Sequence, residues 1–394
     1  MSDESLRLQT LVSVGLRLAQ GARTGRVALA QLEAAIDPAW VPPWASDVLG
    51  QLERAAEATR VPIEYTEVER VVTEAWDAAP SDELDEIDTE PVKVTPGAQI
   101  HRGVLDGDPV AIKILKPDLG ATVRQDLALL EALMAPLAAA FPALDTAAIM
   151  REVRERVLEE LDLEHEAATQ RRFYRALRRH PFLSVPAPIT RLCHEHALVS
   201  HWVDGVPLSE APDPDRAAAQ LLTFTLGAAR WGVAYADPHE ENTLITAGGG
   251  LAIVDFGACR EMDILRLDDA IAVLEAVLAD DADAVADRLS TLGWLPPEHA
   301  ATALELTRAI LGEHLSGGPT RLDGDAVIAV RDRIAEHAST LVDLLPVGRL
   351  APEDLWPARG VVQLLGTIAR LGATGDWAAQ GLAALRDGWD GAAA

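Results

Sequence analysis

The segment from Tyr235 to Gly257 constrains this chain of 394 residues more than any other stretch. It contains two short apolar runs, Thr243–Ile245 and Leu251–Val254, and the glycine-rich turn Ala247–Gly250 lies between them. Short apolar runs on either side of a glycine turn are typical of a β-hairpin. The sequence therefore predicts a hairpin here, with polar residues before its first strand and after its second.

Three of these polar residues carry the chemistry. Asp237 and Asn242 are five positions apart on a predicted loop, and Asp255 follows the second strand within an Asp-Phe-Gly motif. An aspartate in such a loop can accept a proton from a hydroxyl group, while the asparagine and the second aspartate can hold Mg²⁺ against phosphates. Either motif alone is a common chance occurrence. Together they indicate a kinase-like phosphotransferase, provided that a lysine on a strand and a glutamate on a helix precede them.

The required lysine lies in a second predicted hairpin. The runs Ala98–Leu105 and Pro109–Leu115 alternate in polarity and are joined by Asp106-Gly107, a strong hairpin signal. The second strand carries Lys113 among valine, alanine and isoleucine, where an ammonium group is costly unless it meets a phosphate or a carboxylate. The alternative is an edge-strand lysine that faces water.

The required glutamate has several candidates. A helix is predicted from Asp145 to about His180, and Glu160, Asp162 and Glu166 lie close together within it. We expect most of these carboxylates to lie in water, and one of them can turn inward to meet the strand lysine.

The composition predicts a mostly helical protein and restricts its partners. Hydrophobic residues make up 49% of the chain and aromatic residues only 4%, and the net charge is −28. This charge argues against nucleic acid, whose phosphates need lysine and arginine, and against electrostatic docking on anionic lipid. A substrate whose own charge is neutralised by Mg²⁺ is compatible with it.

The cysteines and the N-terminus bear on location. Cys193 and Cys259 are far apart and form no disulfide framework or metal spacing, which fits a reducing cytoplasm. Cys259 follows Asp-Phe-Gly closely and is either a reactive thiol or a small buried side chain. The N-terminus lacks the basic region of a signal peptide, and no long uninterrupted apolar run occurs. We therefore expect a cytoplasmic protein without a transmembrane segment.

With these residues in this order, the chain resembles the UbiB family of atypical kinases, which support ubiquinone biosynthesis in bacteria and mitochondria. The resemblance covers nearly the whole chain and is carried by Glu160–Ala167, His180–Pro186, Ala236–His239 with Asn242, and Val254–Glu261. It implies an α+β, predominantly helical fold of the protein-kinase-like two-lobe kind, with a helical N-terminal extension and extra C-terminal helices. The expected units are the extension at 1–80, an N-lobe at 81–203 and a helical C-lobe at 204–394.

The resemblance also implies roles for individual residues. Lys113 is expected to contact the α- and β-phosphates and to pair with a helix carboxylate, for which we favour Glu160. Asp237 takes the catalytic position, while Asn242 and Asp255 take the metal positions. The other expected nucleotide contacts are Gln99 and His101, which follow the nucleotide loop, and the adenine hinge from His201 to Val203. The implied cofactors are ATP (or ADP) and Mg²⁺.

Three segments depart from the family pattern. The nucleotide loop, Val94–Ala98, contains a proline and a glycine, which change its backbone freedom and its N–H donors. Glu240-Glu241 replaces the usual Pro-Gly and adds two charges beside the metal position. In the extension, Arg17-Leu-Ala-Gln20 stands where the family has Lys-x-Gly-Gln, and the arginine keeps the charge but not the geometry of the lysine. We expect Arg17 and Gln20 to point into the active site, the alternative being that Arg17 only packs with its charge in water.

The resemblance implies a UbiB-like kinase or ATPase that binds Mg-ATP. Its expected action is on or near a lipid, isoprenoid quinone or related small molecule rather than on proteins. A small-molecule phosphotransferase of the aminoglycoside-kinase kind and a nucleotide-binding scaffold without turnover are the alternatives. The expected partners are a nucleotide and a lipid or isoprenoid small molecule, with peripheral membrane contact allowed and nucleic acid excluded.

Overall fold

The computed structural model describes residues 60–117, 146–159, 161–344, 346–349 and 351–391, with isolated positions between 119 and 131. Several predictions fall outside these residues. They concern Arg17, Gln20, Glu160 and all of the predicted extension before residue 60.

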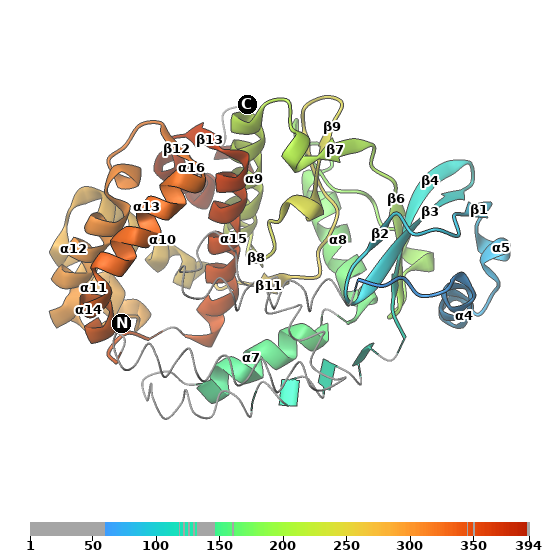
Figure 1. The fold of residues 1–394 in the computed structure, drawn as a ribbon, viewed down its shortest axis with the longest axis horizontal. Helices are drawn as coiled ribbons and strands as arrows, with labels where there is room; N and C mark the ends of the chain where they lie inside the picture. Colours follow the sequence, from blue (N-terminus) through green and yellow to red (C-terminus); the bar gives the residue numbers. More distant parts are fainter. Residues whose placement is uncertain are drawn as a thin grey trace.

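An antiparallel sheet of five strands forms one end of the described molecule (Figure 1). Its strands are β1 (Glu86–Ile87), β2 (Lys93–Val94), β3 (Ala98–Leu105), β4 (Asp108–Leu115) and β6 (Ala197–His201). They run in the order β1-β3-β4-β6, and β2 pairs with the part of β3 that β1 does not cover. The predicted hairpin β3–β4 is confirmed. Its turn residues Asp106 and Gly107 have φ angles of 52° and 84°, the left-handed values that a two-residue hairpin turn requires.

Helix α4 (Tyr65–Trp76) covers one face of this sheet, and the short helix α5 (Pro80–Glu83) follows it. The buried residues of α4, Val68, Val71 and Val72, recur at helical spacing and pack against alternate residues of β4, including Ile112 and Ile114. Successive strand residues point to opposite faces. Lys113, which lies between these two isoleucines, therefore points away from α4.

The long helix predicted from Asp145 to His180 is wrong, because the structure has two helices there. Helix α7 (Thr146–Glu159) ends before Asp162, and α8 (Leu163–Leu177) begins after it. Asp162 is extended, and its carboxylate accepts hydrogen bonds from the N–H groups of Glu164 (2.9 Å) and His165 (3.1 Å). Such an N-cap ends one helix and starts the next in a new direction.

A second sheet has four strands. It contains β5 (Leu183–Ser184), β10 (Leu251–Ile253), β9 (Thr243–Thr246) and β7 (Gly205–Pro207), in this order. The hairpin β9–β10 is the one predicted from sequence. A further pair joins β8 (Val233–Tyr235) to β11 (Cys259–Glu261), and the short helix η5 (Glu240–Asn242) precedes β9.

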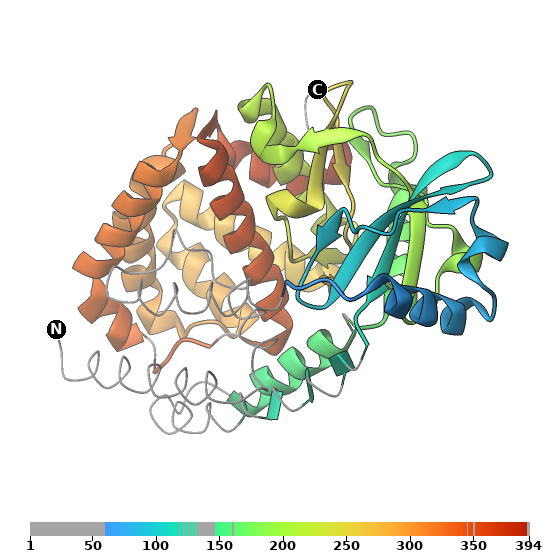
Figure 2. The ribbon, with the colours of Figure 1, turned by 45° about the vertical axis from the view of Figure 1, so that its right-hand side comes forward.

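Helices make up the rest of the described chain. They are α9 (Pro214–Arg230), α10 (Ile264–Ala279), α11 (Ala282–Leu292), α12 (Ala300–Leu311), α13 (Gly324–Glu336), α14 (Ala338–Leu344), α15 (Leu355–Leu371) and α16 (Trp377–Asp387), with the strand pair β12 (Thr320–Leu322) and β13 (Ala373–Gly375). The largest apolar core surrounds the buried α9 and includes Phe173, Phe224 and Leu251. Figure 2 shows α15 lying between the outer helices and the β9–β10 region.

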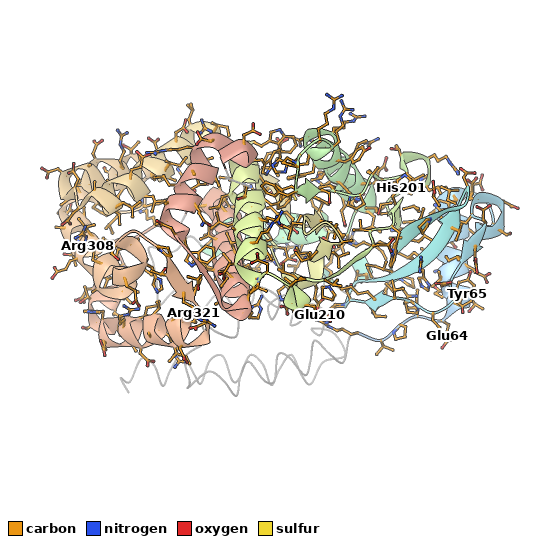
Figure 3. All side chains as sticks on the ribbon, turned by 90° about the horizontal axis from the view of Figure 1, so that it is seen from above. Glu64, Tyr65, His201, Glu210, Arg308 and Arg321 are labelled. Carbon is orange, nitrogen blue, oxygen red and sulfur yellow. The ribbon has the colours of Figure 1, made fainter. Side chains whose placement is uncertain are left out.

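This arrangement is the α+β, predominantly helical, kinase-like fold that the sequence predicted. Seen from above in Figure 3, Tyr65 lies at the sheet end, Arg308 at the helical end and His201 between them. Within the described residues, none of the helices combines the length and apolar character that a membrane crossing requires. Both cysteines are free, with Cys193 buried and Cys259 half-buried.

Candidate active site

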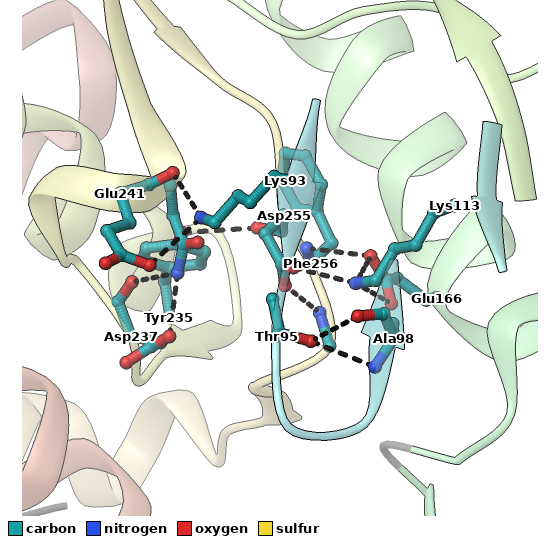
Figure 4. Close-up of polar contacts among 12 residues, drawn as sticks. Lys93, Thr95, Ala98, Lys113, Glu166, Tyr235, Asp237, Glu241, Asp255 and Phe256 are labelled. Atoms are coloured by element: carbon teal, nitrogen blue, oxygen red, sulfur yellow. Dashed lines mark hydrogen bonds and ion pairs between the residues drawn. The ribbon is translucent and has the colours of Figure 1, made fainter. Parts of the chain in front are cut away.

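A buried lysine joins the two sheets at the centre of the candidate site (Figure 4). The Nζ atom of Lys113 on β4 lies 2.8 Å from both carboxylate oxygens of Glu166 on α8. It also lies 2.7 Å from Oδ2 of Asp255, which follows β10. The side chains are 16%, 4% and 30% exposed, respectively, so the lysine does not face water. We call Lys113, Glu166 and Asp255 the buried charge cluster.

This result corrects the predicted partner of Lys113. Glu160 was favoured from the sequence and lies outside the described residues, whereas the glutamate that contacts Lys113 is Glu166. The physical reason is the helix break at Asp162. Glu166 lies in the first turn of the new helix α8, and its N–H donates to the carbonyl of Asp162 (3.1 Å).

The three charges shift one another's pKa. Burial would lower the pKa of Lys113, but the two carboxylates outweigh burial and raise the pKa above its usual 10.5. Burial, together with the charge of Asp255, raises the pKa of Glu166 despite the nearby lysine. Burial also opposes ionisation of Asp255, yet Lys113 and the N–H of Gly257 (3.0 Å) hold the pKa of this carboxyl below its usual range. Lys113 and Asp255 are therefore held in their charged forms.

Asp237 and Asn242 form a second polar group beside the buried charge cluster. The Nδ2 atom of Asn242 donates to Oδ2 of Asp237 at 2.7 Å, and its side chain is buried. The N–H of Val254 donates to the carbonyl of Asn242 at 3.0 Å. Because Asp255 is the next residue, this bond sets Asn242 and Asp255 next to each other at the open end of the β9–β10 hairpin.

The available oxygen atoms fit a magnesium ion. A carboxylate only accepts hydrogen bonds, so the amide nitrogen of Asn242 faces Asp237 and its oxygen is left for a metal. Asp255 supplies a charged oxygen of the hard type that Mg²⁺ prefers. Among the described residues, no three histidine, cysteine, aspartate or glutamate side chains gather as a metal site. Asn242 and Asp255 would thus need phosphate oxygens or water to complete the coordination of Mg²⁺.

The predicted nucleotide loop closes on itself through Thr95. Its hydroxyl accepts a hydrogen bond from the N–H of Ala98 (2.9 Å), and the N–H of Thr95 donates to the carbonyl of Ala98 (2.8 Å). The Nζ atom of Lys116 donates to the carbonyl of Thr95 (2.7 Å), and burial lowers the pKa of Lys116 to about 8. These bonds give the loop a defined shape although it contains Pro96 and Gly97.

Contact of Gln99 and His101 with the nucleotide stays a prediction, and neither side chain faces the buried charge cluster. In the register of β3 and β4 they pair with Ile114 and Ile112, whereas Ile100 pairs with Lys113. Both are fully buried, and Nε2 of Gln99 lies 2.8 Å from Nε2 of His101. The amide oxygen of Gln99 accepts from the N–H of Ile63 (2.9 Å), and Nδ1 of His101 lies 2.8 Å from the carbonyl of Asp88. They secure the chain on the α4 side of the sheet because side chains alternate along a strand.

The predicted hinge lies where the chain passes from one sheet to the other. His201 is the last residue of β6 and is exposed, and Val203 is half-buried two residues before β7. The N–H of Trp202 donates to the carbonyl of Pro109 (2.9 Å), which fixes the hinge to the start of β4. Contact of His201 and Val203 with adenine stays a prediction.

Two groups of charged residues at the site were not found from the sequence. Arg359 on α15 lies 3.2 Å from Oδ1 of Asp237 through its NH2 atom. Lys93 on β2 lies 3.2 Å from Oε2 of Glu241, and Arg60 lies 3.4 Å from Oε1 of the same carboxylate. No local pattern marks these partners, although the acidic pair Glu240-Glu241 had suggested extra charge there.

Comparisons with known proteins agree with the site. The family model of the ABC1 atypical kinase-like domain matches residues 57–289. The chain is 26% identical to the atypical kinase COQ8B, mitochondrial, of Rattus norvegicus over 62% of its own length and 48% of that protein. It is 28% identical to a probable protein kinase UbiB of Aeromonas salmonicida over 55% of its length and 42% of that protein. The chain thus spans less than half the length of these two relatives.

A solved structure supports the same fold. It is the complex of Rv3197 with erythromycin from Mycobacterium tuberculosis, with a TM-score of 0.64 and 20% sequence identity over 96% of this chain and 97% of the other. The domain match covers more than half of the chain, and it contains Lys113, Glu166, Asp237, Asn242 and Asp255. The chain therefore belongs to the family of ABC1 atypical kinase-like proteins, the group that includes the UbiB kinases.

Proposed function

We propose that this protein binds a nucleotide, ATP or ADP, with Mg²⁺ and uses it as an ATPase or phosphotransferase. The observation that carries the proposal is the buried charge cluster, in which Lys113 lies between Glu166 and Asp255, and Asp255 lies next to Asn242. A lysine held by a helix glutamate and a metal-binding aspartate is the arrangement with which kinase-like sites hold nucleotide phosphates. Mg²⁺, when bound, would neutralise phosphate charge between Asn242 and Asp255.

The residues of the candidate site have separate roles in this proposal. Lys113 binds phosphate, and Glu166 keeps its ammonium group pointed toward the site. Asp237 faces the acceptor or a water molecule and takes up a proton from it. The segment from His201 to Val203 holds the base of the nucleotide, and the domain boundaries near residues 80 and 203 separate the extension and the two lobes.

The proposed acceptor is a lipid, an isoprenoid quinone or a related small molecule, reached by peripheral contact with a membrane from the cytoplasm. This part relies on the resemblance to UbiB-like proteins and on relatives named as such. A second candidate is a small-molecule phosphotransferase. One specific observation favours it, namely that the structurally similar Rv3197 was solved in complex with the small molecule erythromycin.

The experiment that tests nucleotide binding is thermal unfolding with ATP or ADP, with and without Mg²⁺. We expect the nucleotide to raise the melting temperature only when Mg²⁺ is present, and Asp255→Asn to abolish this increase, because it removes the charged metal ligand. Asp287→Asn, an exposed aspartate on α11, is the matched control and should behave as the wild type. An unchanged increase in the Asp255→Asn protein would refute the assignment of the metal position.

Turnover separates the candidates. Phosphate release is measured alone, with vesicles of neutral lipid containing an isoprenoid quinone, and with a panel of small hydroxylated acceptors. Stimulation by the quinone vesicles supports the first candidate, and consumption of a small acceptor supports the second. Asp237→Asn is expected to keep nucleotide binding and to lose turnover by roughly a hundredfold, the scale of a lost acid–base group. Normal turnover of this variant would show that the loop is not catalytic.

A further inference from the structure

Helix α15 brings an arginine to Asp237 from the C-terminal part of the chain. The NH2 atom of Arg359 lies 3.2 Å from Oδ1 of Asp237, and Nδ2 of Asn242 lies 2.7 Å from Oδ2. Each carboxylate oxygen of Asp237 therefore has its own donor, one that lies 5 residues away in the sequence and one that lies 122 residues away. A carboxylate held at both oxygens has little freedom to rotate.

The backbone of α15 is held close to the strand that precedes Asp237. A Cβ atom on Gly360 would lie 2.6 Å from the carbonyl oxygen of Tyr235 and 3.2 Å from Cα of Ala236, so only glycine allows this approach. Trp356, one turn earlier, is buried against Ala236 and Ala258. Arg359 thus projects from a part of α15 whose distance from Asp237 is set by close packing.

The guanidinium group of Arg359 is itself well positioned. Its Cζ atom lies 5.7 Å from the ring centroid of Trp356, and the side chain is 17% exposed. Its Nε atom is buried and has no hydrogen-bond partner among the described residues. By contrast, the exposed pair Arg386–Glu275 joins side chains that are 52% and 38% exposed. Arg359 therefore differs from a surface arginine in that burial and stacking restrict it to one orientation beside Asp237.

We propose that Arg359 is a positioning residue of the active site, which acts by fixing the orientation and electrostatic environment of Asp237. This inference rests on the proposed function of Asp237 and extends the site to α15. Turnover then requires the docking of a helix that begins more than a hundred residues after Asp237. A positive charge beside Asp237 also weakens the attraction of this carboxylate for a nearby metal ion, which keeps it separate from the metal ligands Asn242 and Asp255.

The test compares Arg359→Ala, Arg359→Lys and the control Arg386→Ala, which removes an arginine and its ion pair far from the site. For Arg359→Ala we expect kcat to fall about tenfold or more, while the Kd for Mg-nucleotide stays within about twofold of the wild type. Arg359→Lys keeps the charge without the planar donor group and should recover part of kcat. Arg386→Ala should match the wild type in both quantities.

Two results would overturn the proposal. The first is a wild-type kcat in Arg359→Ala. The second is a fall in kcat that Arg359→Lys does not reverse and that a lowered melting temperature of the variant explains. The titration of Mn²⁺, measured by its paramagnetic effect on water relaxation, gives a readout without turnover. Arg359→Ala should bind Mn²⁺ about threefold or more tightly than the wild type, and this gain should vanish in the Asp237→Asn background.

The same two measurements separate this proposal from the proposed function. A wild type that binds Mn²⁺ but does not turn over refutes the ATPase or phosphotransferase function, and the Mn²⁺ difference then decides whether Arg359 acts through Asp237. Equal Mn²⁺ affinity in Arg359→Ala and the wild type overturns the positioning role. A wild type with neither metal binding nor turnover refutes both.

Discussion

Two groups of charged residues join the five-stranded sheet to the loops around β9 and β10, and they differ in burial. The buried charge cluster places Lys113 between Glu166 and Asp255, with side chains 16%, 4% and 30% exposed. The exposed charge cluster places Lys93 and Arg60 around Glu241, with side chains 30%, 34% and 42% exposed. The distances also differ, at 2.7–2.8 Å for the first and 3.2–3.4 Å for the second.

This difference shows which charges the fold depends on. Water and salt screen an exposed pair, so its contribution to stability is small. In the buried cluster, Lys113 and Glu166 have lost most of their water, whereas Asp255 is as exposed as Lys93 of the other cluster. The loss of the lysine therefore leaves the charge of Glu166 uncompensated. The two clusters thus make similar connections across the site, but only the buried one is expected to control both stability and nucleotide binding.

The largest effect is expected from Lys113→Met. It leaves Glu166 and Asp255 as neighbouring carboxylates without a cation, and we expect the free energy of unfolding to fall by about 2–4 kcal/mol. Stabilisation by Mg-nucleotide should also be lost. Lys93→Met is the matched change in the exposed cluster and should cost less than about 1 kcal/mol. Urea unfolding measures both, and equal losses would show that burial does not distinguish the clusters.

A smaller effect on stability is expected from Glu166→Gln, because glutamine can still accept a hydrogen bond from Lys113 and Asp255 still pairs with it. At neutral pH the free energy of unfolding should change by less than about 1 kcal/mol. The folded-state pKa of Glu166 is raised above its usual 4.5, so ionisation of this group costs the wild type stability as the pH rises through that raised pKa. The variant cannot ionise there, so its stability relative to the wild type should increase over the same window.

The functional effect of Glu166→Gln should be larger than its effect on stability. Lys113 would then be held by Asp255 alone, which is also a metal ligand in the proposed function. We expect the Kd for Mg-nucleotide to increase about tenfold, the equivalent of one lost charge-assisted contact. Isothermal titration measures this change. Wild-type affinity in the variant would show that Glu166 has no part in holding the lysine for phosphate.

The smallest effect is expected from Glu241→Gln in the exposed cluster. Burial would raise the pKa of Glu241, but Lys93 and Arg60 lower it below its usual 4.5. A lowered pKa contributes stability that is present above pH 4.5 and is lost as the pH falls through the lowered value. The variant should therefore lose less than about 1 kcal/mol at neutral pH, and nothing at a pH below the lowered pKa. The loss should also shrink as salt is added. If the loss of unfolding free energy persists at high salt, the charges of the exposed cluster are as poorly screened as those of the buried cluster.

The sequence by itself determined the positions of Lys113, Asp237, Asn242 and Asp255 on their elements. Each lies in or beside a hairpin whose turn residues and apolar runs are local signals, such as Asp106-Gly107 and the glycines after Ala247. Local backbone preferences set these hairpins, and the five-residue spacing of Asp237 and Asn242 spans a single loop and the short helix η5. The family and the kinase-like fold were predicted from the resemblance of the motifs around these residues to the UbiB family.

Only the tertiary structure decided which side chains meet. Glu166 contacts Lys113 because Asp162 ends one helix and directs the next, which a single long helical pattern did not reveal. Gln99 and His101 face α4 because that helix covers one side of a sheet whose side chains alternate. Arg359 reaches Asp237 across 122 positions of sequence, through close packing of α15 on β8 that no local pattern encodes. Burial, which separates the two charge clusters, likewise depends on what the rest of the chain places around each charge.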